Sequence, residues 1–150
     1  MSKILVAVNG SPSSEKALET AVTLAQSQNA QLVAITVLDH PDSPNVPSLT
    51  SGQAAQIRAR LDELLQSAVN FARSRGVSLT PILREGHAAD AILACAEQEQ
   101  VELLVLGAGS THSAGQGLGS TADQVSNHCP CAVLLAKQTA ERSHTEKSDP

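Results

Sequence analysis

The sequence is almost without aromatic side chains: Phe71 is the single one among 150 residues, and neither Trp nor Tyr occurs. Proteins that bind single-stranded nucleic acid stack bases on aromatic rings, and cages for quaternary ammonium groups are built from such rings. The composition therefore excludes both kinds of site. Phe71 itself falls on the apolar face of a predicted helix, which favours a place in the core.

Positive charge and long apolar runs are also scarce. The formal net charge is -5 and the sequence pI is near 5.4, which argues against duplex nucleic acid and an anionic membrane surface as partners. No apolar run approaches the roughly 20 residues that span a bilayer. The chain opens with Met-Ser-Lys and enters an apolar strand with no signal peptide, and its three cysteines are an odd number. We expect a reduced, cytoplasmic protein.

What the chain does have is a regular alternation of short apolar strands and amphipathic helices. We predict strands over 3–9, 31–38, 77–83, 101–106 and 131–136, with helices over 12–27, from 50 or 51 to Gly76, around 88–96 and around 118–129. This pattern predicts one α/β domain over 1–137 with an open parallel sheet and helices on both faces, then a flexible tail over 138–150. The polar stretch 39–51 is expected to be a loop. Pro81 indicates an edge strand, so the strand order 3-2-1-4-5 is expected.

This strand order places a binding crevice between the first and fourth strands. Ligands of open parallel sheets bind beyond the carboxyl ends of the strands, at the point where the order reverses. The loops at that point are 9–11 and 107–119. Five of the nine glycines lie in the second loop, within the run GAGSTHSAGQGLGST: Gly107, Gly109, Gly115, Gly117 and Gly119.

The glycine-rich run has the chemistry of a phosphate site. Glycines let backbone amides approach an anion, and Ser120 and Thr121 add hydroxyls for hydrogen bonds or for a metal bound to phosphate. The alternative is a surface loop with glycines at turn positions. A Walker loop would need a lysine that the run lacks, and the dinucleotide fingerprint would need glycine where His112 stands.

Three stretches of the sequence resemble the universal stress protein family, and together they span about residues 3–136. They are KILVAVNGSPSSEKAL, then EGHAADAIL followed by VELLVLG, and finally GSTADQVSNHCPCAVLLA. The resemblance implies a parallel sheet of order 3-2-1-4-5 and a homodimer formed through the fifth strand, here Cys131–Ala136. It also implies one of two branches: one binds ATP through a Gly-x2-Gly-x9-Gly-[Ser/Thr] loop, and the other lacks that loop.

Carried across by position, Gly107 matches the first glycine of this loop, and Gly119 with Ser120 matches its terminal pair. The second glycine position falls on Ser110, and the spacer that follows is one residue short. Gly109 is the neighbouring glycine that would compensate.

The adenosine end of such a site falls on two other strands. The family's first-strand Asp is Asn9 here, which keeps a hydrogen-bonding group but loses the charge. Val37 matches the second-strand position that packs near adenine.

Charge limits how strongly this site would hold a nucleotide. No Lys or Arg occurs between Arg84 and Lys137, an interval with six acidic residues: Glu85, Asp90, Glu97, Glu99, Glu102 and Asp123. We therefore expect weak, Mg-dependent ATP binding by a regulatory module. The alternatives are a dimeric interaction protein without nucleotide and a slow ATP hydrolase. The sequence offers no catalytic residue for the hydrolase.

The cysteines are expected to be structural. Cys95 lies on the apolar face of the third helix, which favours the core. A disulfide between Cys129 and Cys131 would be strained across Pro130. A zinc site using His128 and these two thiols would need a fourth ligand and an unusual spacing.

Overall fold

The computed structural model describes residues 2–39, 50–108 and 120–137, in which strands and helices alternate as the sequence predicts. The elements are β1 (Lys3–Ala7), α1 (Pro12–Gln28), β2 (Gln31–Asp39), α2 (Ser51–Ser74), β3 (Leu79–Gly86), α3 (Ala88–Glu99), β4 (Leu103–Gly107), α4 (Ser120–His128) and β5 (Ala132–Ala136). Most of the predicted loop 39–51, the glycines from Gly109 to Gly119 and the tail 138–150 lie outside the described residues.

The five strands form one parallel sheet of order β3-β2-β1-β4-β5, which confirms the predicted topology. Ile4 of β1 pairs with Leu32 of β2 on one side and with Leu103 of β4 on the other. Pro81 lies on β3, opposite Ala34, and β3 is an edge strand. A proline lacks the N–H that an inner ladder needs, so the prediction drawn from Pro81 is confirmed.

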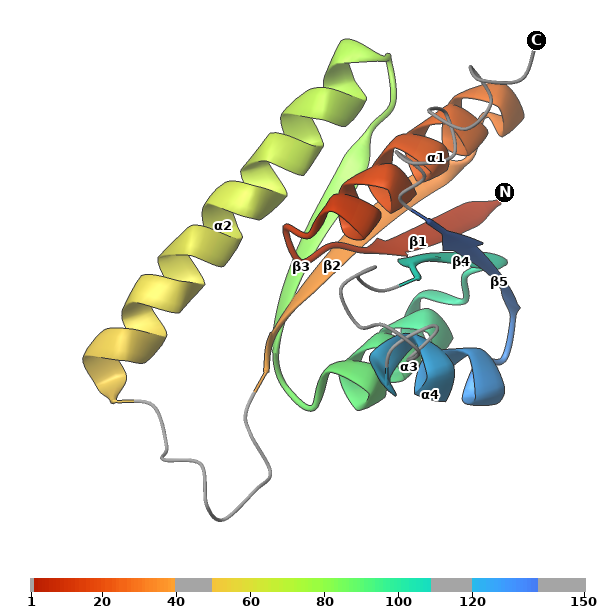
Figure 1. Cartoon of the computed structure of the whole chain (residues 1–150). Helices are drawn as coiled ribbons and strands as arrows, with labels where there is room; N and C mark the ends of the chain where they lie inside the picture. The colour runs from red at the N-terminus through yellow and green to blue at the C-terminus, as the bar shows by residue number, and fades with distance from the viewer. Residues whose placement is uncertain (1, 40–49, 109–119, 138–150) are drawn as a thin grey trace, which may run out of the picture.

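Two helices cover each face of the sheet, as Figure 1 shows, with α1 and α2 on one face and α3 and α4 on the other. Successive residues of a strand point to opposite faces. Ile4 therefore belongs to the core cluster under α1 and α2, whereas Leu5 belongs to the cluster under α3 and α4. Cys95 is buried in this second cluster, as predicted.

The predicted caps begin the first two helices. Ser11 caps α1 and accepts a hydrogen bond from the Ser14 N–H, with Pro12 in the first turn. Thr50 and Gln53 form a reciprocal capping box at the start of α2. Within the described residues, no helix is both long enough and apolar enough to cross a membrane.

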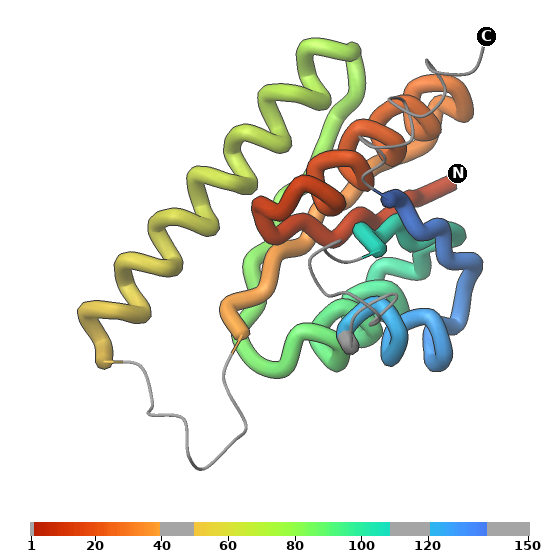
Figure 2. The backbone as a smooth tube through the Cα atoms, in the orientation of Figure 1, coloured from red at the N-terminus to blue at the C-terminus, as the bar shows by residue number. Residues whose placement is uncertain are grey.

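Helix α2 is longer than the strands it covers. Its 24 residues extend about 36 Å, whereas the eight residues of β3 extend about 26 Å. The N-terminal turns of α2 stand away from the sheet in Figure 2. Of the apolar face predicted for this helix, three residues are buried and three are half-buried: Leu65, Ala68 and Ala72, against Ile57, Leu61 and Leu64. Phe71, expected in the core, is half-buried and packs against the first cluster from its margin.

The ends of β1 and β3 differ from the prediction, because hydrogen bonding to the neighbouring strand stops earlier or continues further than expected. β1 ends at Ala7, although the Val8 N–H still donates to the Ile35 carbonyl of β2 at 2.9 Å; pairing stops at Asn9, whose N–H bonds to the side chain of Ser14 instead. β3 begins two residues later than expected and continues to Gly86, because β2 stays paired with it as far as Asp39. The sequence shows the apolar run but not the length of the partner strand.

Candidate functional site

The candidate site lies at the carboxyl ends of β1 and β4, the neighbouring strands between which the strand order reverses. β1 leads into α1 through residues 8–11, and β4 ends at Gly107. The amino end of α1 meets both strand ends, because Ser14 bonds to Asn9 after β1 and Ser13 lies against Gly107 of β4. After Gly107 the chain stays beside β5, because the Ala108 N–H donates to the Ala136 carbonyl at 2.8 Å. The predicted switch point is therefore present in the fold.

Asn9 shapes the loop between β1 and α1. Its side-chain oxygen Oδ1 accepts a hydrogen bond from the Ser11 N–H at 3.0 Å, which forms an Asx turn. Gly10 within this turn has φ +85°, a conformation that suits glycine. The backbone N–H of Asn9 donates to Ser14 Oγ at 3.1 Å. Asn9 is exposed, so one side-chain oxygen holds the turn while the residue itself faces solvent.

Three serines build the first turn of α1. Ser11 Oγ accepts from the Ser14 N–H at 3.2 Å and lies 3.3 Å from Ser13 Oγ. Ser14 Oγ donates to the Ser11 carbonyl at 3.2 Å. Ser13 and Ser14 are only 4% and 5% exposed. Sequence reasoning identified Ser11 as the cap but missed the structural role of the other two. Their hydroxyl groups contact residues 9 and 11 and so hold the loop between β1 and α1 in place. The spacing of the serines in the sequence does not predict these contacts.

Gly107 lies directly against this turn. A Cβ atom at this position would be 2.6 Å from Ser13 Oγ, 2.7 Å from the Ser13 carbonyl carbon and 2.8 Å from the Ser14 nitrogen. Real Cβ atoms do not approach other atoms so closely, so only glycine fits here without a shift. The first glycine of the predicted loop therefore lets β4 and α1 pack in contact, whatever ligand the loop meets.

The structure thus brings Asn9 and Gly107 together around one helix end. Val37 lies on the neighbouring strand β2, two residues after Ile35, and Ile35 pairs with Ala7 of β1. Val37 is half-buried beside the cluster under α3 and α4. The preceding residue, Thr36, was missed by sequence reasoning. Its Oγ1 is buried and, among the described residues, has no hydrogen-bond partner.

The other predicted residues lie at or before the start of α4. Ser120 is the first residue of α4, and Thr121, the second, is half-buried. Gly109 and Gly119 lie outside the described residues. Helix α4 leads into parallel strand β5, so its amino end points to the same edge of the sheet as the amino end of α1. Two helix N-termini, each a site of partial positive charge, therefore face this edge.

A separate hollow of about 470 Å³ lies at the opposite, amino-terminal edge of the sheet. It is lined mainly by polar residues, including Gln26, Asn29 and Gln31. Lys3 Nζ and Glu99 Oε1, both also lining it, form an ion pair at 3.2 Å. Lys3 lies at the edge of the sheet opposite the candidate site and is already paired with Glu99. It therefore does not contribute to that site.

Comparisons with known proteins agree with this fold. A family model described as the universal stress protein family matches residues 1–137. The universal stress protein YxiE of Bacillus subtilis is 30% identical over 145 residues, which cover 90% of this chain and 98% of that protein. The solved structure of the universal stress protein UspA from Lactobacillus plantarum has a TM-score of 0.77 at 27% identity and covers 90% of this chain and 97% of its own.

Two other solved structures share the fold and contain a nucleotide. The universal stress protein from Archaeoglobus fulgidus in complex with dAMP is 21% identical, with a TM-score of 0.69 over 91% of this chain and 98% of its own. A universal stress protein in complex with cAMP is 23% identical, with a TM-score of 0.68 over 91% of this chain and 96% of its own.

Proposed function

The chain belongs to the universal stress protein family, and we propose that it is a nucleotide-responsive binding module that takes up ATP weakly, with Mg²⁺, at the carboxyl ends of β1 and β4. The observation that carries the proposal is the packing of Gly107 and Asn9 around the amino end of α1. That packing puts the start of the glycine-rich run beside the loop that would meet the nucleoside. The dAMP and cAMP complexes of two proteins with this fold support the same class of ligand.

The charges of this edge support weak binding. The chain has no Lys or Arg from residue 85 to residue 136, and the exposed Lys137, directly after β5, is a cation at this edge. Apart from it, the triphosphate would be met by backbone amides, by the hydroxyls of Ser120 and Thr121, and by helix N-termini. Asp39 ends β2 and Asp123 lies in the first turn of α4. Asp39 and Asp123 offer the oxygen ligands that Mg²⁺ prefers, and the charge of the metal would offset the repulsion between carboxylate and nucleotide.

The adenine would rest on aliphatic surface. Val37 is half-buried on the second strand beside β1, and Phe71, the lone aromatic residue, packs in the cluster under α1 and α2. The base would therefore gain contact with Val37 and hydrogen bonds from the backbone, without a stacked ring.

Calorimetry and thermal unfolding with millimolar Mg-ATP test the proposal. We expect measurable heat and a raised Tm, both lost with EDTA, because the metal supplies the missing positive charge. The double variant Ser120→Ala, Thr121→Ala should bind at least tenfold more weakly, since a hydrogen bond to a charged group contributes about 1.5–3 kcal/mol. Gln28→Ala, exposed at the far end of α1, is the matched control.

The second candidate is a dimeric interaction protein that binds no nucleotide. The stretch from residue 85 to residue 136, which has six acidic residues and no Lys or Arg, favours it. No heat and no shift of Tm at millimolar Mg-ATP would establish this candidate over the first. Mass spectrometry of small molecules released from the purified protein separates the two independently, and a turnover assay with the same double variant tests for slow hydrolysis.

Both candidates share a homodimer through the fifth strand, Cys131–Ala136. Strand β5 is an edge of the sheet, with Ala132 and Leu134 exposed. An apolar edge strand offers unpaired backbone groups and side chains to a second copy of the chain.

A further inference from the structure

Two thiols meet at the junction between α4 and β5. Cys129 directly follows α4 and Cys131 directly precedes β5, with Pro130 between them in a bend of the chain. Their Sγ atoms are 3.4 Å apart, which is contact distance for two sulfur atoms. Both cysteines are free and only partly buried, whereas Cys95 is buried in the core. In a single chain the fold therefore presents one close thiol pair that a small reagent can reach, with Cys131 at the first position of the segment proposed to form the dimer.

The surroundings of the pair hold a proton on Cys131. Burial, the hydrogen bond with Cys129 and the negative charge of a Cys129 thiolate together raise the pKa of the Cys131 thiol to about 12, with burial as the largest cause. The Cys131 thiol also donates to the Ala132 carbonyl at 3.5 Å. The single S–H of Cys131 can point either to this carbonyl or to Cys129 Sγ, 3.4 Å away. A mixed disulfide at Cys129 removes two of these causes, the hydrogen bond and the charge, so it lowers the pKa of Cys131 for the second attack. The first attack is therefore assigned to Cys129.

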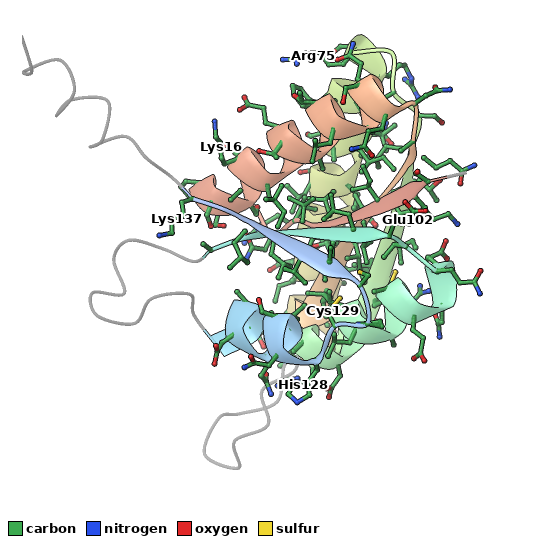
Figure 3. All side chains as sticks on the ribbon, turned by 90° about the vertical axis from the view of Figure 1, so that its right-hand side faces the viewer. Lys16, Arg75, Glu102, His128, Cys129 and Lys137 are labelled. Carbon is green, nitrogen blue, oxygen red and sulfur yellow. The ribbon has the colours of Figure 1, made fainter. Side chains whose placement is uncertain are left out.

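Metal binding is a poor explanation of this pair. His128 Nδ1 donates to the Gln124 carbonyl at 2.9 Å, so that nitrogen is held within α4. In Figure 3, His128 lies at the outer side of α4 and Cys129 on the side nearer the sheet. Across the described parts of the chain, no group of three or more His, Cys, Asp or Glu residues is arranged to hold a metal ion. The position of the two sulfurs is better explained by a disulfide that forms between them on oxidation.

We propose that Cys129 and Cys131 are a redox-active dithiol that exchanges with small disulfides. The Cys129 thiolate attacks one sulfur of the small disulfide, which forms a mixed disulfide and releases one thiolate. Cys131 then loses its proton to that thiolate and attacks Cys129 Sγ, which breaks the mixed bond and releases the second thiolate. In sum, two protein thiols are oxidised to one disulfide, and one small disulfide is reduced to two thiols.

The geometry makes this bridge easy to reverse. A bridge between two cysteines separated by a single proline cannot easily adopt the preferred disulfide geometry, so the disulfide is strained. Strained disulfides have more oxidising potentials and belong to the labile, regulatory class. The bridge should therefore form only under oxidising conditions. It would tie the end of α4 to the start of the edge strand β5.

The test equilibrates the full chain in glutathione buffers with an increasing fraction of oxidised glutathione. The samples are quenched with acid, the free thiols are alkylated, and the mass of the intact protein is measured by mass spectrometry. Wild type should pass from three alkylated thiols to one, carry no glutathione, and return to three with dithiothreitol. The control Cys95→Ser should pass from two to none. Thermal melts of each variant establish that it is folded.

The single variants Cys129→Ser and Cys131→Ser should lose the bridge, and Cys131→Ser should instead accumulate a glutathione adduct on Cys129. Three results would overturn the proposal. Wild type could keep three alkylated thiols at every buffer ratio, it could hold glutathione as stably as Cys131→Ser does, or it could link to a second chain on a non-reducing gel.

Discussion

At the scale of single residues, position 107 requires glycine because there is no room for a side chain. Replacing it with Ala puts a Cβ atom 2.6 Å from Ser13 Oγ and 2.7 Å from the Ser13 carbonyl carbon. The backbone of the first turn of α1 would have to move, and overpacking of this kind costs about 1–3 kcal/mol. We expect Gly107→Ala to lower the free energy of unfolding by that amount in urea titrations without nucleotide.

Gly52 provides the matched control for this substitution. It is exposed in α2, and a Cβ atom there would meet only Thr50 Oγ1, at 4.0 Å. Gly52→Ala should stabilise the protein by about 0.5–1 kcal/mol, because alanine loses less conformational freedom in a helix. Equal stability of Gly107→Ala and wild type would mean that the close contact with α1 is not a packing constraint, and that Gly107 serves a ligand alone.

At the scale of elements, α2 depends on its capping box more than a fully buried helix would. Its first half is only partly buried, and Arg58 ties it to β3 by an ion pair with Glu85. Thr50 Oγ1 accepts from the Gln53 N–H at 3.1 Å, and Gln53 Oε1 accepts from the Thr50 N–H at 2.9 Å.

Thr50→Ala should therefore loosen the first turn of α2. Loss of an N-cap side chain costs about 1 kcal/mol, which corresponds to about fivefold faster exchange of amide hydrogens that open with this turn. Hydrogen exchange measured residue by residue tests this, and exposed Gln56→Ala on the same helix is the control. Unchanged protection in Thr50→Ala would show that contacts along the helix, rather than the cap, hold its start.

At the scale of the whole molecule, the two edges of the sheet differ in a way that bears on assembly. Edge strand β3 carries Pro81 and is paired with β2 over eight positions, whereas β5 leaves Leu134 36% exposed. Leu134→Lys should convert a dimer to a monomer in light scattering at micromolar concentration, because a charge on an edge strand opposes pairing. Thr80→Lys on β3 should leave the dimer intact. A monomeric wild type would contradict the proposed assembly.

The sequence by itself determined most of the fold. Apolar periodicity marked each strand and helix, Pro81 marked the edge, and Thr50 with Gln53 marked the start of α2. These features act over a few neighbouring residues, through dihedral preferences and local hydrogen bonds, so they can be read from order alone. The pattern of Gly107, Ser120 and Thr121 likewise indicated which edge of the sheet to examine.

The tertiary structure decided what depends on distances between separate elements. It set Gly107 against Ser13, bonded Asn9 to Ser14, and left the first half of α2 partly uncovered. It also brought two thiols across Pro130 into contact at 3.4 Å, although the sequence had indicated only strain there. Such contacts follow from how helices settle on a twisted sheet, and no local pattern specifies that packing.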